Sequence, residues 1–183
     1  MLTAELEKQL LTVARNSIKY GLEKKEKIRL TLTDYPDTLR EIRATFVTLN
    51  IGSALRGCIG TTLAISPLVI SVSDNAYAAA FNDPRFPSLN SREFENTRIS
   101  VSILTPAEGI TFASEQQLLA QVRPGIDGLI IEKGNNKATF LPAVWESLPL
   151  AKDFLIHLKQ KANIGPDQLP ERAWRYQSVS FSE

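Results

Sequence analysis

The chain has 183 residues with a single cysteine, and 21 Lys and Arg against 20 Asp and Glu give it a formal charge of +1. This length fits one domain, with room for two lobes that share a core, and the near-neutral charge disfavours general nucleic-acid binding. One cysteine excludes an internal disulfide, and every apolar stretch is broken before the ~18 residues that a membrane span requires. With no charged-then-apolar leader, the sequence predicts a cytoplasmic protein.

The first fifth of the chain predicts one long helix followed by a link. Thr3 is placed to cap a helix whose apolar residues follow the helical spacing as far as Gly21. The mixed charges of residues 23–27 are typical of a solvated connection between elements. Residues 28–32 form a short alternating segment before a loop rich in turn-forming residues.

A hairpin and a second helix are predicted next. Residues 43–49 and 55–61 are β-rich, and residues 50–53 turn the chain between them, so the two segments are expected to pair. Ser66 as a cap and Pro67 as the first helical residue then predict a helix that continues through an alanine-rich stretch. The prolines of residues 82–87 end it, because the residue before a proline is pushed out of helical space.

The second half of the chain alternates strand and helix signals. Residues 98–104 place apolar and polar side chains in alternation, as in a strand with one wet face. Ser114 and Gln117 form a capping-box pattern that predicts a short helix. Four further elements follow: a hairpin of 129–132 with 138–141, a helical turn from Pro142 that carries Trp145, a helix over 150–161, and a last strand over 174–181.

The hexapeptide Leu-Arg-Gly-Cys-Ile-Gly at residues 55–60 is the segment least expected of plain scaffold. Side chains two apart on a strand share a face, so Arg56 and Cys58 are expected to point the same way. A guanidinium nearby favours the thiolate, and glycine lets a ligand approach closely. We therefore take Cys58 and Arg56 as candidate catalytic residues, and Gly57 and Gly60 as candidate ligand-binding residues.

A structural interpretation of the same hexapeptide stands beside the functional one. An unpaired cysteine is commonly a small buried hydrophobe. The two glycines fit a β-bulge or a crowded crossing of strands, and Arg56 fits a partner of a surface carboxylate.

Three other residues carry chemistry that the sequence leaves open. Asp83 and Arg85 flank a rigid kink, where they either fix the loop as an ion pair, the favoured interpretation, or present charge to a ligand. We keep both as candidate ligand-binding residues. His157 is the only histidine and suits a general base for Cys58 by type alone, since no spacing brings the two together; a helix-surface role is expected.

The chain resembles the AMMECR-type domain family along nearly all its length. The resemblance is carried by the intact hexapeptide, by Asp83-Pro84-Arg85-Phe86 at the usual distance, and by the strand Ile99 to Leu104 with Thr105-Pro106. Later family elements are the turn around Asp127, Phe140-Leu141-Pro142 with Val144-Trp145, and the helix that contains Leu158-Lys159. The ordered set is far more specific than any one motif.

The resemblance implies an α+β fold of two unequal lobes, with antiparallel sheets flanked by helices and a cleft that bears the hexapeptide. It names no reaction and no cofactor. In bacteria such proteins look like one component of the AmmeMemoRadiSam system, together with a Memo-type protein and a radical S-adenosylmethionine protein. These two are the partners that the resemblance implies.

Two functional hypotheses from different classes follow. In the first, Cys58 acts as a nucleophile or thiol carrier, Arg56 stabilises its thiolate or holds an anionic substrate, and Asp83 and Arg85 line the same cleft. In the second, the hexapeptide recognises a partner or a small anion without turnover. The sequence contains no metal-ligand spacing, phosphate-binding loop or dinucleotide-binding glycine pattern, so neither hypothesis includes a metal or a cofactor.

Overall fold

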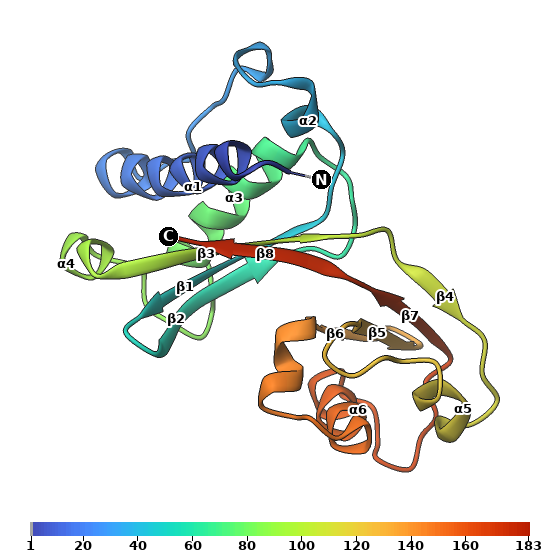
Figure 1. Cartoon of the computed structure of the whole chain (residues 1–183). Helices are drawn as coiled ribbons and strands as arrows, with labels where there is room; N and C mark the ends of the chain where they lie inside the picture. Colours follow the sequence, from blue (N-terminus) through green and yellow to red (C-terminus); the bar gives the residue numbers. More distant parts are fainter. Residues whose placement is uncertain (1) are drawn as a thin grey trace. The chain divides into compact units, whose positions relative to one another are not determined.

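The computed structural model describes residues 2–183. The chain forms two compact units, of which the first comprises the residues up to Ile103 together with Val179–Glu183 and the second comprises Leu104–Ser178. Each unit contains one four-stranded sheet with helices against it (Figure 1). The expected fold class, α+β with two antiparallel sheets flanked by helices, is confirmed.

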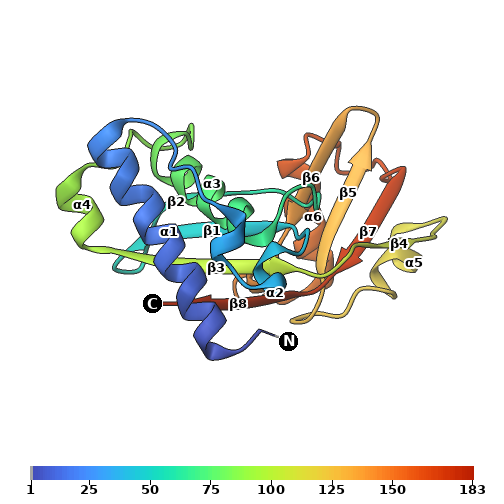
Figure 2. The ribbon, with the colours of Figure 1, turned by 90° about the horizontal axis from the view of Figure 1, so that it is seen from above.

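The first unit is built on a sheet with the strand order β2-β1-β3-β8. Strand β1 pairs antiparallel with both β2 and β3. Helix α3 packs against β1 and β2, and α1 packs against α3, so that both helices lie on one face of the sheet (Figure 1, Figure 2). The elements of this unit are α1 (Ala4–Lys24), α2 (Asp37–Arg40), β1 (Thr45–Ile51), β2 (Ala54–Gly60), α3 (Leu68–Phe81), α4 (Ser91–Glu95), β3 (Thr97–Leu104) and β8 (Ser178–Ser182).

Alternation along the strands places the core of the first unit between the sheet and the two helices. Val47 and Leu49 of β1 are fully buried, as are Ile99 and Val101 of β3. They pack with the apolar side chains of α1 and α3 in one cluster. The residues between them along each strand face the other side of the sheet, which lies outside this core and which we call the open face.

The predicted helices of the first unit form, with shifted ends. Thr3 caps α1 by accepting from the N–H of Leu6, and the helix runs past Gly21 to Lys24. Helix α3 begins at Leu68, and Ser66 does not cap it. Pro67 itself takes φ −52° and ψ 141°, outside helical space, and pairs with Ile42 in an isolated β-bridge.

The segment at residues 28–32 forms no strand. Residues 28–30 lie outside regular structure, and Leu32 opens a short 3₁₀ helix, Leu32–Asp34. The hairpin prediction is confirmed: β1 and β2 pair antiparallel, with a tight turn in which Gly52 takes a positive φ of 59°.

The second unit has the strand order β4-β7-β5-β6. Its core joins this sheet to α5 and α6, and the Trp145 ring stacks on Phe154 with the ring centroids 3.8 Å apart. The predicted hairpin is β5 with β6, closed by a turn at Gly134. The elements are β4 (Glu108–Ile110), α5 (Glu115–Leu119), β5 (Gly128–Lys133), β6 (Asn136–Phe140), a 3₁₀ helix (Pro142–Glu146), α6 (Ala151–Lys161) and β7 (Arg172–Tyr176).

The C-terminal tail is two strands and not one. Strand β7 ends at Tyr176 and belongs to the second sheet, whereas β8 begins at Ser178 and belongs to the first. Gln177 separates them and exchanges two hydrogen bonds with Thr105: its N–H donates to Thr105 Oγ1, and its carbonyl accepts from the Thr105 N–H. No helix within residues 2–183 is both long and apolar enough to cross a membrane.

Candidate functional site

Cys58 lies on β2, an edge strand, directly opposite Thr48 of β1. The thiol is half-buried, and the Thr48 hydroxyl donates to Sγ at 3.3 Å. The N–H and carbonyl of Cys58 point away from β1, toward the free edge of the sheet, because both have partners outside the ladder. Thr48 and Cys58 are therefore a non-hydrogen-bonded pair, the kind in which opposite side chains lie closest.

The loop after α3 occupies this edge of the sheet at Cys58. Asp83 Oδ2 accepts from the Cys58 N–H at 2.9 Å, and Arg85 Nη2 donates to the Cys58 carbonyl at 3.3 Å. The two side chains thus replace the acceptor and the donor that a neighbouring strand would supply. A strand of another molecule cannot pair with β2 at Cys58 unless this clamp opens.

The Asp83–Arg85 pair is asymmetric in exposure. The Asp83 side chain is 2% exposed, whereas that of Arg85 is 54% exposed. Arg85 binds Asp83 through Nε and Nη2, at 2.9 and 2.7 Å. The hydrogen bonds from the Arg85 side chain, with those from the Cys58 and Arg85 N–H groups, hold the pKa of Asp83 well below its usual range despite burial. Asp83 is therefore a fixed carboxylate near neutral pH and not a proton carrier.

Arg56 lies at a β-bulge, and its guanidinium is held by other groups. Leu49 pairs with Gly57 while Asn50 pairs with Leu55, so Arg56 has no opposite residue. This shift interrupts the strict alternation from which a common face for Arg56 and Cys58 was expected. The arginine is 7% exposed and binds both oxygens of Glu93, at 2.9 and 3.0 Å, and the Pro87 carbonyl at 2.8 Å.

Glu93 is the carboxylate partner of Arg56. The hydrogen bonds from Arg56 lower the pKa of the Glu93 carboxyl below its ordinary value. Within residues 2–183, Arg56 Nη1 is a buried nitrogen without a hydrogen-bond partner. Its guanidinium carbon lies 5.6 Å from the centroid of the Phe86 ring, at a cation–π distance.

The two glycines of the hexapeptide are sites of close approach. A Cβ at Gly57 would lie 2.1 Å from the carbonyl oxygen of Ala79 in α3. A Cβ at Gly60 would lie 2.3 Å from the Phe46 ring and from the Thr45 carbonyl oxygen. Both glycines therefore have a packing reason to be glycine. Ligand binding at Gly57 and Gly60 stays a prediction.

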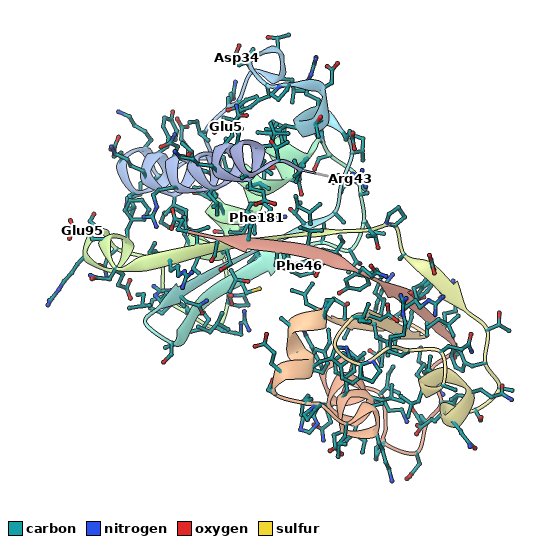
Figure 3. The ribbon with its side chains drawn as sticks, in the orientation of Figure 1. Glu5, Asp34, Arg43, Phe46, Glu95 and Phe181 are labelled. Atoms are coloured by element: carbon teal, nitrogen blue, oxygen red, sulfur yellow. The ribbon has the colours of Figure 1, made fainter. Side chains whose placement is uncertain are left out.

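The open face beside Cys58 carries small polar side chains in register. Cys58, Thr48 and Ser100 are direct neighbours across β2, β1 and β3, which makes a row of one thiol and two hydroxyls. Phe46 is the next residue of β1 on this face, two residues before Thr48, and it lies between Gly60 and Ser102. Figure 3 places Phe46 on the face of the sheet opposite the helices.

The sequence contained a signal for these side chains. Thr48 alternates with core residues along its strand, and Ser100 lies on the predicted wet face of residues 98–104. Their alignment with Cys58 depends on strand register, which the sequence does not specify.

His157 lies on the exposed side of α6 in the second unit, and Cys58 lies in the first unit. Its Nδ1 is 2.9 Å from the Asp153 carbonyl of its own helix. Within residues 2–183, no group of three or more His, Cys, Asp or Glu side chains is arranged to hold a metal ion.

The class of protein defined by this fold is a two-unit α+β chain with a cysteine on an edge hairpin, and comparison with known proteins gives its family. The AMMECR1 family matches residues 11–181, and the chain belongs to this family. The family resemblance drawn from the sequence is thus confirmed. Membership of the bacterial AmmeMemoRadiSam subtype stays a prediction.

Archaeal relatives match nearly the whole chain. A protein of Methanothermobacter thermautotrophicus is 36% identical over 182 residues, which cover 95% of this chain and 92% of the relative. A protein of Pyrococcus abyssi is 37% identical over 187 residues, covering 95% and 88%. The crystal structure of an uncharacterized protein from Pyrococcus horikoshii superposes with a TM-score of 0.91 at 32% identity and covers 100% of this chain and 93% of that one.

Proposed function

We propose that this AMMECR1-family protein binds an anionic ligand on the open face beside Cys58 and uses the Cys58 thiol as its reactive group. The observation that carries the proposal is that the backbone and the side chain of Cys58 are held by different groups. The clamp of Asp83 and Arg85 fixes the Cys58 backbone at the edge, and the side chain lies on the open face against the Thr48 hydroxyl.

Arg85 supplies the positive charge that the sequence analysis assigned to Arg56. More than half of its side chain is exposed, and Nη2 already lies at the Cys58 carbonyl. Both arginines bind a carboxylate through Nε and Nη2, but Arg56 is buried, so a ligand reaches Arg85 more readily. In this proposal Arg85 attracts the anion, and Arg56 supports the loop that carries Arg85.

The step that fits these groups is attack by the thiolate on an electrophilic carbon of the anionic ligand. A bond forms between sulfur and carbon, the leaving group departs with the bonding electron pair, and the thiol proton passes to water. The proposal places the protein in the reducing cytosol, where a free thiol persists.

One observation favours a second function, recognition without turnover. The Asp83 carboxylate contacts the Cys58 backbone, and its depressed pKa prevents it from accepting a proton near neutral pH. A binding module needs no such base. In this alternative the open face and Arg85 recognise an anion or an acidic partner segment, and Cys58 provides only shape.

Substitution separates the two functions. Tagged protein, purified from its native cytosol, is analysed by mass spectrometry for groups attached at Cys58 and for co-purifying proteins. Cys58→Ser and Arg85→Gln are compared with Arg92→Gln, a change of an exposed arginine in the same unit. An adduct on the wild-type thiol that Arg85→Gln diminishes supports the reactive site. Capture that survives Cys58→Ser but not Arg85→Gln supports recognition, and no effect of Arg85→Gln on either readout contradicts both.

The same purification tests the partners. We propose a Memo-type protein and a radical S-adenosylmethionine protein, on the family resemblance alone. Their enrichment with wild type and Arg92→Gln, and its loss with Arg85→Gln, is the expected result. Equal recovery from a mock purification contradicts the partnership.

A further inference from the structure

Glu93 lies at the start of a continuous set of contacts that ends at the Cys58 backbone. Its carboxylate is oriented by α4, because it accepts from the N–H of the cap residue Asn90 at 3.1 Å while Asn90 Oδ1 accepts from the Glu93 N–H at 3.0 Å. The same carboxylate binds the buried guanidinium of Arg56 at two points. One side chain thus ties the beginning of α4 to the bulge of β2.

Arg56 also contacts the loop after α3. It donates to the Pro87 carbonyl at 2.8 Å, and the Phe86 ring lies against both guanidinium groups of the site. The ring centroid is 5.6 Å from the guanidinium carbon of Arg56 and 5.5 Å from that of Arg85. The Phe86 N–H also donates to the Asp83 carbonyl at 3.1 Å, which closes the turn that presents Asp83.

We propose that Glu93 is a positioning residue for the Cys58 site, acting through Arg56 and Phe86 on the clamp formed by Asp83 and Arg85. The inference concerns how the site is held. It rests on the proposed function only where it links the position of the clamp to the reactivity of Cys58. Its physical basis is charge burial. Without the Glu93 carboxylate, Arg56 becomes an unpaired buried cation that already has one unsatisfied nitrogen.

An unpaired Arg56 is expected to move toward water, because burial of a charge without a partner is strongly unfavourable. Pro87 and Phe86 are its other contacts, so the loop follows. Asp83 then leaves the Cys58 N–H. The core face of the sheet takes no part in these contacts and is expected to stay intact.

The test is amide hydrogen exchange, measured by NMR on the full chain with Glu93→Gln. We expect the Cys58 amide to exchange about tenfold faster or more than in wild type, and the Val47 amide of the neighbouring strand to change by less than about twofold. The Asp83 carboxyl is expected to titrate at higher pH than in wild type, since its hydrogen bonds loosen. Unchanged exchange at Cys58, or equal acceleration at Val47, overturns the proposal.

Two variants control for general effects. Glu41→Gln removes the partner of Arg43 in an exposed pair of the same unit, and Cys58 exchange is expected to stay at its wild-type rate. Val72→Ala leaves a cavity in the core and destabilises the unit without touching the loop. If Val72→Ala accelerates Cys58 relative to Val47 as strongly as Glu93→Gln does, the proposal is overturned.

Phe86→Leu keeps the test decisive should Glu93→Gln fail to fold. Leucine retains bulk but removes the ring from both arginines, so the Cys58 amide is expected to lose protection selectively, and retained protection is the contrary result. None of these measurements requires the thiol to react. An inert Cys58 with selective acceleration would therefore contradict the proposed function and leave the role of Glu93 standing.

Discussion

Asp83 accepts a hydrogen bond from the backbone N–H of Cys58 at 2.9 Å, although the two residues are 25 positions apart. The carboxylate is buried, and Arg85 donates to both of its oxygens. This contact joins the two segments that the sequence singled out, the hexapeptide and the Asp-Pro-Arg-Phe loop, into one structural unit. It also closes the edge of β2 at the cysteine.

Removal of the Asp83 carboxylate is expected to destabilise the protein. Asp83→Ala leaves the Cys58 N–H without its acceptor, and an unsatisfied buried group costs about 1–3 kcal/mol. Asp37→Ala is the matched control, because Asp37 also binds a nearby arginine but its side chain is 93% exposed; its effect should stay within about 0.5 kcal/mol. Urea unfolding followed by circular dichroism measures both, and equal effects of the two variants would refute the structural role of Asp83.

The Asp83 carboxylate should also give the protein a defined acid sensitivity. Because its pKa in the folded state is depressed, its contribution to stability is present above the unfolded value of about 3.9 and is lost as the pH falls toward the folded value. The difference in unfolding free energy between wild type and Asp83→Asn should therefore be constant from pH 7 to 5 and shrink below about pH 4. Urea midpoints across this range test the sign, and a gap that widens on acidification would be the opposite of the expected result.

Gly57 is expected to tolerate no side chain. A methyl group there would meet the backbone carbonyl of Ala79 at 2.1 Å, and such overpacking costs about 1–3 kcal/mol because the backbone of α3 must shift. Gly109→Ala is the control, since the nearest atoms to its Cβ lie 3.9 Å away. Thermal unfolding of the two variants measures the difference. Similar melting temperatures for both variants would contradict this prediction, because the backbone of α3 would then shift at little cost in stability.

Thr48→Val tests the hydroxyl at the thiol. Valine keeps the shape of threonine and removes the donor that lies 3.3 Å from Sγ, so native Cys58 should react more slowly with iodoacetamide at neutral pH. Ser102→Ala removes a hydroxyl from the same open face that pairs with Ser180, away from the sulfur, and should leave the rate unchanged. A rate in Thr48→Val equal to wild type would remove Thr48 from the site.

Both hairpins and most strands could be predicted because their signals are local, whereas β4 was not predicted. Alternation identified β3, and glycine turns identified the hairpins at Gly52 and Gly134. The pattern Asn90-x-x-Glu93 is a capping box that indicates α4, a helix that we did not predict. The last strand was predicted without its break, because nothing in its own residues shows that they pair in two different sheets.

The contacts among the candidate site residues could not be predicted from the sequence. Glu93 is 37 positions from Arg56, and no spacing rule connects a bulged strand to a later helix. The bulge itself follows from pairing between Leu49 and Gly57, which only the folded hairpin sets. For that reason the sequence left Arg56 with two roles, at the thiolate or with a carboxylate, and the structure pairs it with the carboxylate of Glu93. Arg85 was a candidate because it flanks the proline kink, but its contact with the Cys58 carbonyl depends on the fold and could not be predicted.

The most direct measurement of the central claim is the rate at which iodoacetamide alkylates Cys58 in the native chain, compared with the same chain unfolded in urea at the same neutral pH. Cys58 is the only cysteine, so each adduct reports on this residue alone. If Cys58 is the reactive group of the proposed function, the native thiol is expected to react about tenfold faster than the unfolded one, which lacks the contacts with Thr48 and Arg85. A native rate below the unfolded rate would contradict a reactive thiol on the open face.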